Sequence, residues 1–522
     1  MNVNMSVFGG DLLTPTTEVN FSAQCLYGDT GCAELMASSS SMLASAASIS
    51  LTALSSLLVA PWVLAISIGV LCWCTQTIPF ILCDRRRVAP QKLPTSIWTI
   101  HGKHYDLSSW AKEHPGGKWA IDLGRNRDCT GLFESYHVFV DEAKLDKILA
   151  RFEIPSRKSV KGEPNGVELD NNQTGLVFRD EFHRDVKKLL RSHFKGKSHK
   201  MKPWVACLLA FLTCCEVYVT YLFLHGSAIA VVLLPFIGWL LCANVAHDGS
   251  HFAASRRPCL NTLASYMGMP LCFPSTGWHL QHVIQHHVYT NDEDDVDLYH
   301  FLPICRTSQI TQWTTRFSFQ WLTIFALLPT TVGHLMFTVP VDLLSGQVDL
   351  VTGTKRYSQC QNLGDFVARF RSHIVLEWVA CVAFFGLSVY MQGFWGMRRL
   401  FMVYSISSYL FIINTQGAHL QGACMVGKEG QYKSWAKRQT ATSVNFHPDS
   451  YLWLLFTGGL NLQSLHHVAP CVGSSHFIDL YPEYKKLCQK HGVHVKEVKN
   501  IFEFFQGFLM WIRELAREPD NQ

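Results

Sequence analysis

The chain has 522 residues, of which 48% are hydrophobic and only 16% are charged. An average soluble domain carries about 25% charged residues, so the composition argues against a wholly soluble or disordered chain and favours one partly embedded in lipid. The net charge of +5 is small for this length and indicates no nucleic-acid partner. The 18 cysteines include no Cys-x-x-Cys pair, and many lie in apolar runs, where cysteine behaves as a small hydrophobic residue.

The N-terminal part of the chain predicts a polar tail and a membrane anchor. Residues 1–42 are rich in Ser and Ala and contain no Lys or Arg. Residues 43–83 run almost without charge, and about 20 apolar residues suffice to cross a bilayer, so we expect an extra N-terminal transmembrane helix here. Arg85, Arg86 and Arg87 follow directly. By the positive-inside rule, this places the chain after the anchor in the cytoplasm.

Two polar segments come next. Residues 94–155 have the mixed pattern of a small globular domain. Residues 156–203 form a linker and a basic segment that includes Lys187 and Arg191. The basic segment has two interpretations, a solvated helix face or an anchor on the cytoplasmic membrane surface.

Residues 204–522 predict a helical membrane domain. The apolar segments 204–223 and 228–246 are joined by a very short connector and predict a hairpin that crosses the membrane and returns. Segments 374–391 and 400–413 predict a second hairpin, which completes a four-helix transmembrane core.

A further apolar segment, residues 319–341, contains Pro329, Pro340 and His334 and is the weakest candidate for a crossing. A third crossing would also place the last histidines on the wrong side of the membrane. We therefore assign this segment as interfacial or re-entrant.

The small globular segment contains a two-histidine pattern. It reads His114-Pro-Gly-Gly117 and, 23 residues after the first histidine, ends Thr130-Gly-Leu-Phe-Glu-Ser-Tyr-His137. Proline and glycine favour a tight loop that lets backbone approach a flat ligand. This pattern resembles the cytochrome b5 domain, which is a small α+β fold. The resemblance implies a haem b held by His114 and His137; two axial imidazoles leave the iron able to carry electrons but not to bind oxygen.

Three histidine boxes follow in the membrane domain. Box one is His247-Asp-Gly-Ser-His251, box two is Gln281-His282-Val-Ile-Gln-His286-His287, and box three is Gln463-Ser-Leu-His466-His467. In an α-helix, residues four apart share a face. The first two histidines of box two are therefore expected to hold one cation together, with His287 directed at a second. Polar clusters next to a bilayer are costly and mark functional sites, so the boxes predict a dimetal site.

The boxes resemble those of the membrane fatty acid desaturase superfamily, and the similarity runs from about Trp204 to Val493. Gln463 at the head of box three, together with the fused cytochrome b5 domain, resembles the front-end desaturases. The resemblance implies a mainly α, integral membrane desaturase domain whose cytosolic cap holds two iron ions. It further implies a catalytic set of His247, His251, His282, His286, His287, Gln463, His466 and His467. His419, in Asn414-Thr-Gln-Gly-Ala-His419, is added as a metal ligand on the resemblance alone.

Box two departs from the common pattern because three residues, not two, separate its first histidine from the pair. Either His282 or His279 can therefore be the first ligand of the box. The acidic run Asp292-Glu-Asp-Asp295, with Asp297, resembles the acidic stretch that often follows box two, but it also suits a solvated loop. The stretch Trp435 to Phe446 also resembles the family.

Breaking an unactivated methylene C–H bond needs a metal–oxygen oxidant, and imidazole-rich sites suit iron. The resemblance implies O2, an acyl lipid or acyl-CoA substrate, and electrons from the fused haem domain, whose tethering raises its effective concentration. It also implies an NADH-cytochrome b5 reductase as partner and a multi-pass location in the endoplasmic reticulum membrane, with haem domain and histidine boxes in the cytosol. Box two is similar to that of some protist polyunsaturated desaturases, which favours delta-5 or delta-4 over delta-6 or delta-8 desaturation.

Three alternatives stay open at this point. A sphingolipid long-chain-base desaturase can share the haem fusion and the glutamine of box three. A fatty acyl hydroxylase can use the same di-iron cage. A haem-bearing electron-transfer protein with an inactive desaturase half would contain an empty cage.

Overall fold

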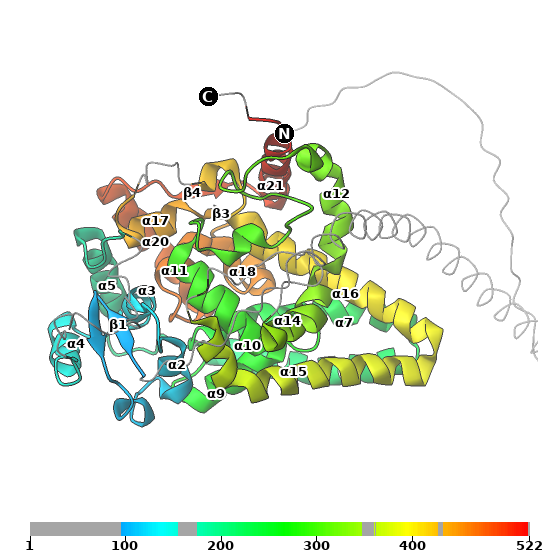
Figure 1. The fold of residues 1–522 in the computed structure, drawn as a ribbon, viewed down its shortest axis with the longest axis horizontal. Coiled ribbons are helices and arrows are strands. Elements are labelled where there is room, and N and C mark those ends of the chain that lie inside the picture. The colour runs from blue at the N-terminus through cyan, green and yellow to red at the C-terminus, as the bar shows by residue number, and fades with distance from the viewer. Residues whose placement is uncertain (1–95, 155–174, 347–359, 361, 426–431, 520–522) are drawn as a thin grey trace, which may run out of the picture. The chain divides into compact units, whose positions relative to one another are not determined.

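A computed structural model of the chain describes residues 96–154, 175–346, 360, 362–425 and 432–519. This described part is mainly helical and carries two small two-stranded sheets (Figure 1). The mainly α class is therefore confirmed. The polar tail, residues 1–42, and the N-terminal transmembrane segment, residues 43–83, lie outside the described residues.

The first described unit is a small α+β domain, as predicted. Two antiparallel strands pair through the register Trp98 to Tyr105, and the side chains of Trp98, Ile100, Tyr105 and Leu149 share one buried cluster. The elements are β1 (Trp98–Ile100), β2 (Lys103–Tyr105), η1 (Trp110–Lys112), α2 (Gly117–Leu123), α3 (Thr130–Tyr136) and α4 (Glu142–Leu149). His114 lies in the loop before α2, and His137 directly follows α3.

Helix α5 (Glu181–His193) connects the small domain to the rest of the chain. Its apolar face packs on α20 (Phe477–Lys490), with Phe182, Val186 and Leu190 fully buried. On its basic face, Lys187 donates to Glu134 over 2.5 Å, and Arg191 donates to two backbone carbonyls of the small domain. Lys187 and Arg191 thus contact the small domain, whereas Arg184 and Lys188 of the same helix are exposed.

Two helical hairpins form the apolar part of the structure. Helix α6 (Pro203–Leu224) turns directly into α7 (Ala228–Leu241), which continues through the π-helical η2 (Cys242–Ala246) into α8 (His247–Ser250). Helix α15 (Leu363–Gln392) turns at Gly393 into α16 (Phe394–Thr415), and Figure 1 shows the two helices joined at this turn. Both predicted hairpins are present.

Among the described residues, four helical runs are long and apolar enough to cross a membrane: Pro203–Leu224, Ala228–Ser250, Thr315–Ser345 and Leu363–Gln392. By length and composition, the run that contains residues 319–341 is therefore a candidate membrane crossing, whereas α16 is not. Two arginines, Arg398 and Arg399, lower the hydropathy of α16 near its start.

The run Thr315–Ser345 is an irregular helix. It changes winding several times, near Pro329 and again before Pro340, since a proline removes one backbone donor of the helix. Its parts are η6 (Thr315–Phe319), α12 (Gln320–Leu327), η7 (Leu328–Thr330), α13 (Thr331–Gly333), η8 (His334–Thr338) and α14 (Val339–Ser345).

Short helices between and after the hairpins carry the histidine boxes. Between the hairpins lie α9 (Pro258–Ser265), η3 (Tyr266–Gly268), α10 (Ser275–Trp278), the π-helical η4 (His279–His286), α11 (His287–Tyr289) and η5 (Val296–Tyr299). After α16 come η9 (Gln416–Ala418), η10 (Gly422–Cys424), α17 (Trp435–Ala441), β3 (Val444–Phe446), α18 (Tyr451–Thr457), η11 (Leu460–Leu462), α19 (Gln463–Val468), η12 (Ser474–His476), α20, β4 (Lys496–Val498) and α21 (Ile501–Leu515). Strands β3 and β4 pair in parallel.

Box three meets box one because of a glycine. Gly458 ends α18 in the left-handed conformation, with φ +62°, and a Cβ at this position would overlap the backbone carbonyl of Ala243 in η2. A residue with a side chain would have to push the two segments apart. This close approach brings α19 against the helix that ends in box one.

Candidate metal centre and haem site

The structure brings the three histidine boxes and His419 into one buried cluster. The histidines come from α8 and its C-terminal end, from η4, from the start of α11, from the end of η9 and from α19. Each histidine of the cluster is at most 4% exposed. The members are His247, His251, His282, His286, His287, His419, His466 and His467.

Several Nε2 atoms face one another inside the cluster. The Nε2 of His282 lies 3.2 Å from that of His247, 3.0 Å from that of His251 and 3.1 Å from that of His287. A neutral imidazole has one nitrogen lone pair that can bind a metal. Lone pairs gathered at this spacing suit one shared cation at the usual metal–nitrogen distance of about 2 Å.

The ligand atoms fall into groups whose members lie within 4.8 Å of one another. One group is His247, His251, His282 and His466, a second is His286, His419 and His467, and a third is His287, His466 and His467. Because the third group shares members with the other two, the arrangement suits two neighbouring cations.

The outward nitrogens of four cluster histidines are held by partners outside the cluster. The Nδ1 contacts are 2.6 Å from His251 to the Tyr136 hydroxyl, 3.0 Å from His286 to Asp295, 2.9 Å from His419 to the Thr442 carbonyl and 2.8 Å from His467 to the Gln439 amide oxygen. A hydrogen bond at Nδ1 fixes the tautomer and leaves Nε2 free for a metal. Metal-binding histidines are built in this way.

Gln463, expected beside the histidines of box three, lies at the second group. Its amide nitrogen is 2.8 Å from Nε2 of His419 and 3.3 Å from Nε2 of His467. Its amide oxygen is buried and has no hydrogen-bond partner among the described residues. The two ends of an amide exchange places by a flip, so this side chain can direct its oxygen to a cation in the second group.

Box two does not have the α-helical geometry that the sequence analysis assumed. Because η4 is π-helical, His282 meets the residue five positions later, His287, and it joins the group of box one. His286 joins His419 instead. The expectation that His282 and His286 together hold one cation is therefore wrong.

His279, the rival first ligand of box two, lies outside the metal-compatible groups of the described residues. Its Nδ1 donates to the carbonyl of Ser275 over 2.7 Å, and its ring packs edge-on against Trp119, with 5.4 Å between ring centres. The structure thus brings His282 into the cluster and directs His279 elsewhere.

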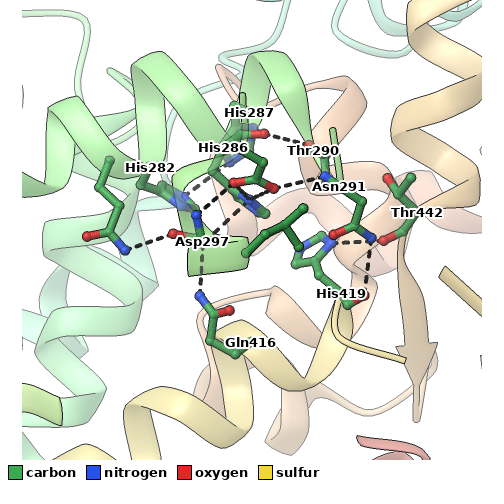
Figure 2. Close-up of polar contacts among 12 residues, drawn as sticks. His282, His286, His287, Thr290, Asn291, Asp297, Gln416, His419 and Thr442 are labelled. Atoms are coloured by element: carbon green, nitrogen blue, oxygen red, sulfur yellow. Dashed lines mark hydrogen bonds and ion pairs between the residues drawn. The ribbon is translucent and has the colours of Figure 1, made fainter. Parts of the chain in front are cut away.

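The acidic run after box two is only partly solvated. Asp295 is fully buried and Asp297 nearly so, and their carboxylates lie 3.0 and 3.4 Å from Nδ1 of His286. Figure 2 shows Asp297 accepting a hydrogen bond from Gln416 on its other side. Burial alone would lower the pKa of His286, but the two carboxylates outweigh it and raise the pKa to about 9.

The other cluster histidines outside the membrane-spanning runs have lowered pKa values. Burial is the main cause, and the neighbouring imidazoles add to it. These pKa shifts apply to His251, His282, His287, His419, His466 and His467. The side chains are therefore neutral near pH 7, which is the form that binds a metal.

The two histidines of the small domain face each other in a separate site. The ring centres of His114 and His137 are 5.9 Å apart, and two imidazoles on opposite sides of one iron stand roughly 6 Å apart at metal–nitrogen distances of about 2 Å. The Nδ1 of His137 donates to the Phe133 carbonyl over 2.8 Å, and that of His114 to the Gly117 carbonyl over 3.4 Å. Both rings can therefore present Nε2 to a haem iron, so His114 and His137 are suited to hold a haem.

Comparison with known proteins agrees with this geometry. Residues 225–499 match the family model described as fatty acid desaturase, and residues 84–199 match the cytochrome b5-like heme/steroid binding domain. The chain belongs to the fatty acid desaturase family. The predicted fusion of a desaturase domain to a cytochrome b5 domain is thereby confirmed, and the chain is a fatty acid desaturase, which is an oxidoreductase.

Similar desaturases occur in algae, slime moulds and fungi. An acyl-lipid omega-13 desaturase of Chlamydomonas reinhardtii is 31% identical, over 80% of this chain and 94% of its own length. A probable Delta(5) fatty acid desaturase C of Dictyostelium discoideum is 26% identical, over 82% of this chain and 94% of its own length. An acyl-lipid (8-3)-desaturase of Mortierella alpina is 25% identical, over 81% of this chain and 94% of its own length. Membership of the desaturase family implies an acyl lipid substrate, O2 and bound metal, and the cytochrome b5 domain implies haem and electron transfer.

Three residues next to the cluster were missed by the sequence analysis: Tyr136, Gln439 and Thr442. The last two lie in the stretch Trp435 to Phe446, whose similarity to the desaturases was noted without a role. Tyr136 adjoins the expected haem ligand His137, but nothing in the sequence indicates its contact with box one.

Proposed function

We propose that this desaturase is a front-end enzyme of polyunsaturated acyl chains, inserting a double bond between an existing one and the carboxyl end. Delta-5 is the leading position and delta-4 the next, with delta-6 and delta-8 behind them. The observation that carries the proposal is the buried cluster of box histidines with Gln463 beside it, adjoining a haem domain. Relatives named as Delta(5) desaturases support the position.

The residues have the following proposed roles. His247, His251, His282 and His466 hold one iron, and His286, His419, His467 and Gln463 hold the second. His287 lies between the two groups. His114 and His137 hold a haem b. The reductant is an NADH-cytochrome b5 reductase, and the enzyme resides in the endoplasmic reticulum membrane with both sites in the cytosol.

When bound, the metal pair supplies with O2 an oxidant strong enough to remove hydrogen from unactivated carbon. The reaction takes one hydrogen from each of two adjacent methylene carbons. With two further electrons and two protons, O2 leaves as two molecules of water. The haem domain delivers these electrons one at a time.

The protein's own contribution is to hold the ligands and keep water out. Hydrogen bonds from Nδ1 of His286, His419 and His467 to fixed oxygens hold each Nε2 toward the cluster. The burial of all of the cluster histidines keeps water away from the reacting region. Ligands held in advance need little rearrangement when charge develops in the reaction.

The proposal is tested by expressing the full chain in yeast, feeding polyunsaturated acids and analysing the lipids. New double bonds on the carboxyl side of existing ones are expected. His466→Ala should remove them while leaving the haem spectrum intact, and His494→Ala, at an exposed position, should not. Absence of acyl double bonds with every precursor would overturn the proposal. A product in long-chain bases would instead indicate a sphingolipid desaturase, and a hydroxylated acyl chain would indicate a hydroxylase.

A further inference from the structure

The haem domain reaches the metal cluster through Tyr136. This residue is the last of α3 and immediately precedes His137. Its hydroxyl lies 2.6 Å from Nδ1 of His251. Its ring is nearly parallel to that of His251 and meets Phe252 edge-on, with 5.8 Å between centres. One residue therefore touches a ligand candidate of the cluster and is covalently joined to a ligand candidate of the haem.

When the cluster holds a metal, the hydrogen bond between Tyr136 and His251 has His251 as its donor. The Nε2 of His251 lies inside the cluster, 3.0 Å from Nε2 of His282. A cation bound there uses Nε2, so the proton of the ring stays on Nδ1. Nδ1 then donates to the oxygen of Tyr136, and the tyrosine holds the ring in its metal-binding tautomer.

Two glycines of the haem domain allow it to pack closely on the desaturase domain near Tyr136. In α3, a Cβ on Gly131 would lie 2.8 Å from the side chain of Val288, which follows box two. At the start of α2, a Cβ on Gly117 would lie 2.6 Å from Pro258. Both glycines thus let the haem domain approach the desaturase domain more closely than any other residue would allow.

A buried ion cluster holds α3 in place. Glu134, one turn before His137, accepts from Lys187 over 2.5 Å and from Arg179 over 2.6 Å. Glu134 and Lys187 are at most 2% exposed. Since Lys187 belongs to α5, which packs on the desaturase domain, the pair ties α3 to that domain.

We propose that Tyr136 is a positioning residue that carries the electron path from the haem to the metal cluster, through His137 on one side and His251 on the other. The inference rests on the proposed function. Each transfer moves one electron, oxidising haem iron from Fe(II) to Fe(III) and reducing one cluster iron from Fe(III) to Fe(II). No covalent bond forms or breaks, and the Nδ1 proton stays in the hydrogen bond.

A second contact between the two domains is a weaker route. Trp119 of α2 packs against His279 and His373, with ring centres 5.4 and 4.9 Å apart. Neither histidine belongs to a metal-compatible group among the described residues. The Trp119 route therefore ends beside the cluster, whereas the Tyr136 route ends on one of its members.

The test is Tyr136→Phe in the full chain loaded with haem and iron. The ring remains and only the hydroxyl is lost. The haem is reduced anaerobically with one equivalent of dithionite and mixed with O2 and acyl substrate, and its absorption is followed in a stopped-flow instrument. Losing the outer partner of a metal ligand costs about 10–100-fold, so haem reoxidation should slow at least tenfold. The haem potential and the iron content should match those of the wild type.

Tyr266→Phe is the matched control. Its hydroxyl lies 2.7 Å from Nδ1 of His373, so the variant removes a tyrosine–histidine hydrogen bond of the same kind away from the cluster. Haem reoxidation should keep the wild-type rate in this variant.

Two results would overturn the inference: wild-type reoxidation in Tyr136→Phe, or a slower rate explained by lost iron or by a shifted haem potential. Failure of the proposed function is a separate result. It would be a wild-type protein that reoxidises its haem with O2 and substrate but forms no acyl double bond, while the rates of the two variants still decide the role of Tyr136.

Discussion

The chain contains two histidine sites that are built in opposite ways. In the haem domain, two rings stand 5.9 Å apart, and their Nδ1 atoms are bound by nearby backbone carbonyls. In the cluster, Nε2 atoms approach to between 3.0 and 3.2 Å, and several Nδ1 atoms are bound by groups far away in the sequence. The two sites thus differ in how many imidazoles converge and in whether the Nδ1 partners are local or distant in the sequence. The first site is local to one small domain, while the second depends on the whole membrane domain.

The largest expected effect comes from removing a residue shared by two groups of the cluster. His466→Ala should abolish desaturation and lower the non-haem iron content, because this side chain belongs to the first of the three groups and also to the third. The haem spectrum should stay unchanged, since no haem ligand is touched. Lipid analysis and metal analysis of the purified variant check this. Full activity would contradict the role of His466 in the cluster, and a lost haem spectrum would contradict the separation of the two sites.

The reverse change is His137→Ala, which should abolish haem binding while the cluster keeps its iron. Desaturation by the purified enzyme with reductase and NADH should then fall to background, because no fused haem passes electrons on. The absorption spectrum and the iron content measure the two sites independently. Loss of non-haem iron together with haem would contradict the independence of the sites.

A smaller effect is expected from the outer partners of the cluster. Asp295→Asn weakens the hydrogen bond to His286 and should lower activity or metal affinity about 10–100-fold. Glu293→Gln is a matched control because it removes an exposed carboxylate of the same acidic run. Titration with iron of the metal-free proteins distinguishes them, and equal affinities would refute a role for Asp295.

The smallest effect concerns the attachment of the haem domain. Glu134→Gln removes the nearer of the two carboxylates that pair with the buried Lys187, the other being Glu142 at 3.2 Å. Breaking a buried ion pair costs about 3 kcal/mol. Glu153→Gln breaks the exposed pair with Lys103 and should leave the unfolding midpoint unchanged. Thermal unfolding of the two variants, followed at the haem absorption, gives the comparison.

The stability of the fold should depend on pH through the carboxylate of Glu134. Burial would raise the pKa of Glu134, but His101, Lys187 and Arg179 outweigh it and hold the pKa below its ordinary value of 4.5. A lowered pKa means that the fold favours the ionised form, so this stabilisation is present above about pH 4.5 and is lost as the pH falls further. Glu134→Gln should therefore flatten the acid side of the stability profile.

Much of the candidate site was predictable from sequence because the residue types are specific. His114 and His137 lie on either side of a short domain, and the three boxes contain their ligands within a few residues. The two hairpins were predictable because a bilayer requires long apolar helices. His419 needed the family resemblance, because a lone histidine after a helix has no pattern of its own.

What the sequence could not provide depends on winding and on long-range contacts. Because η4 is π-helical, His282 contacts His287 and is not paired with His286. No residue type in box two predicts this winding. Tyr136 and His251 are 115 positions apart, and their contact exists only because the two domains pack together. Asp295 looked like part of a solvated run until the fold buried it against His286.

The most direct test of the two-site account is the ratio of non-haem iron to haem in the purified full chain, measured for wild type and for His466→Ala. We predict two non-haem irons per haem in the wild type, and a clear loss of them with full haem retention in the variant. A wild-type protein that binds haem but no other iron, or a variant that keeps both irons, would contradict it.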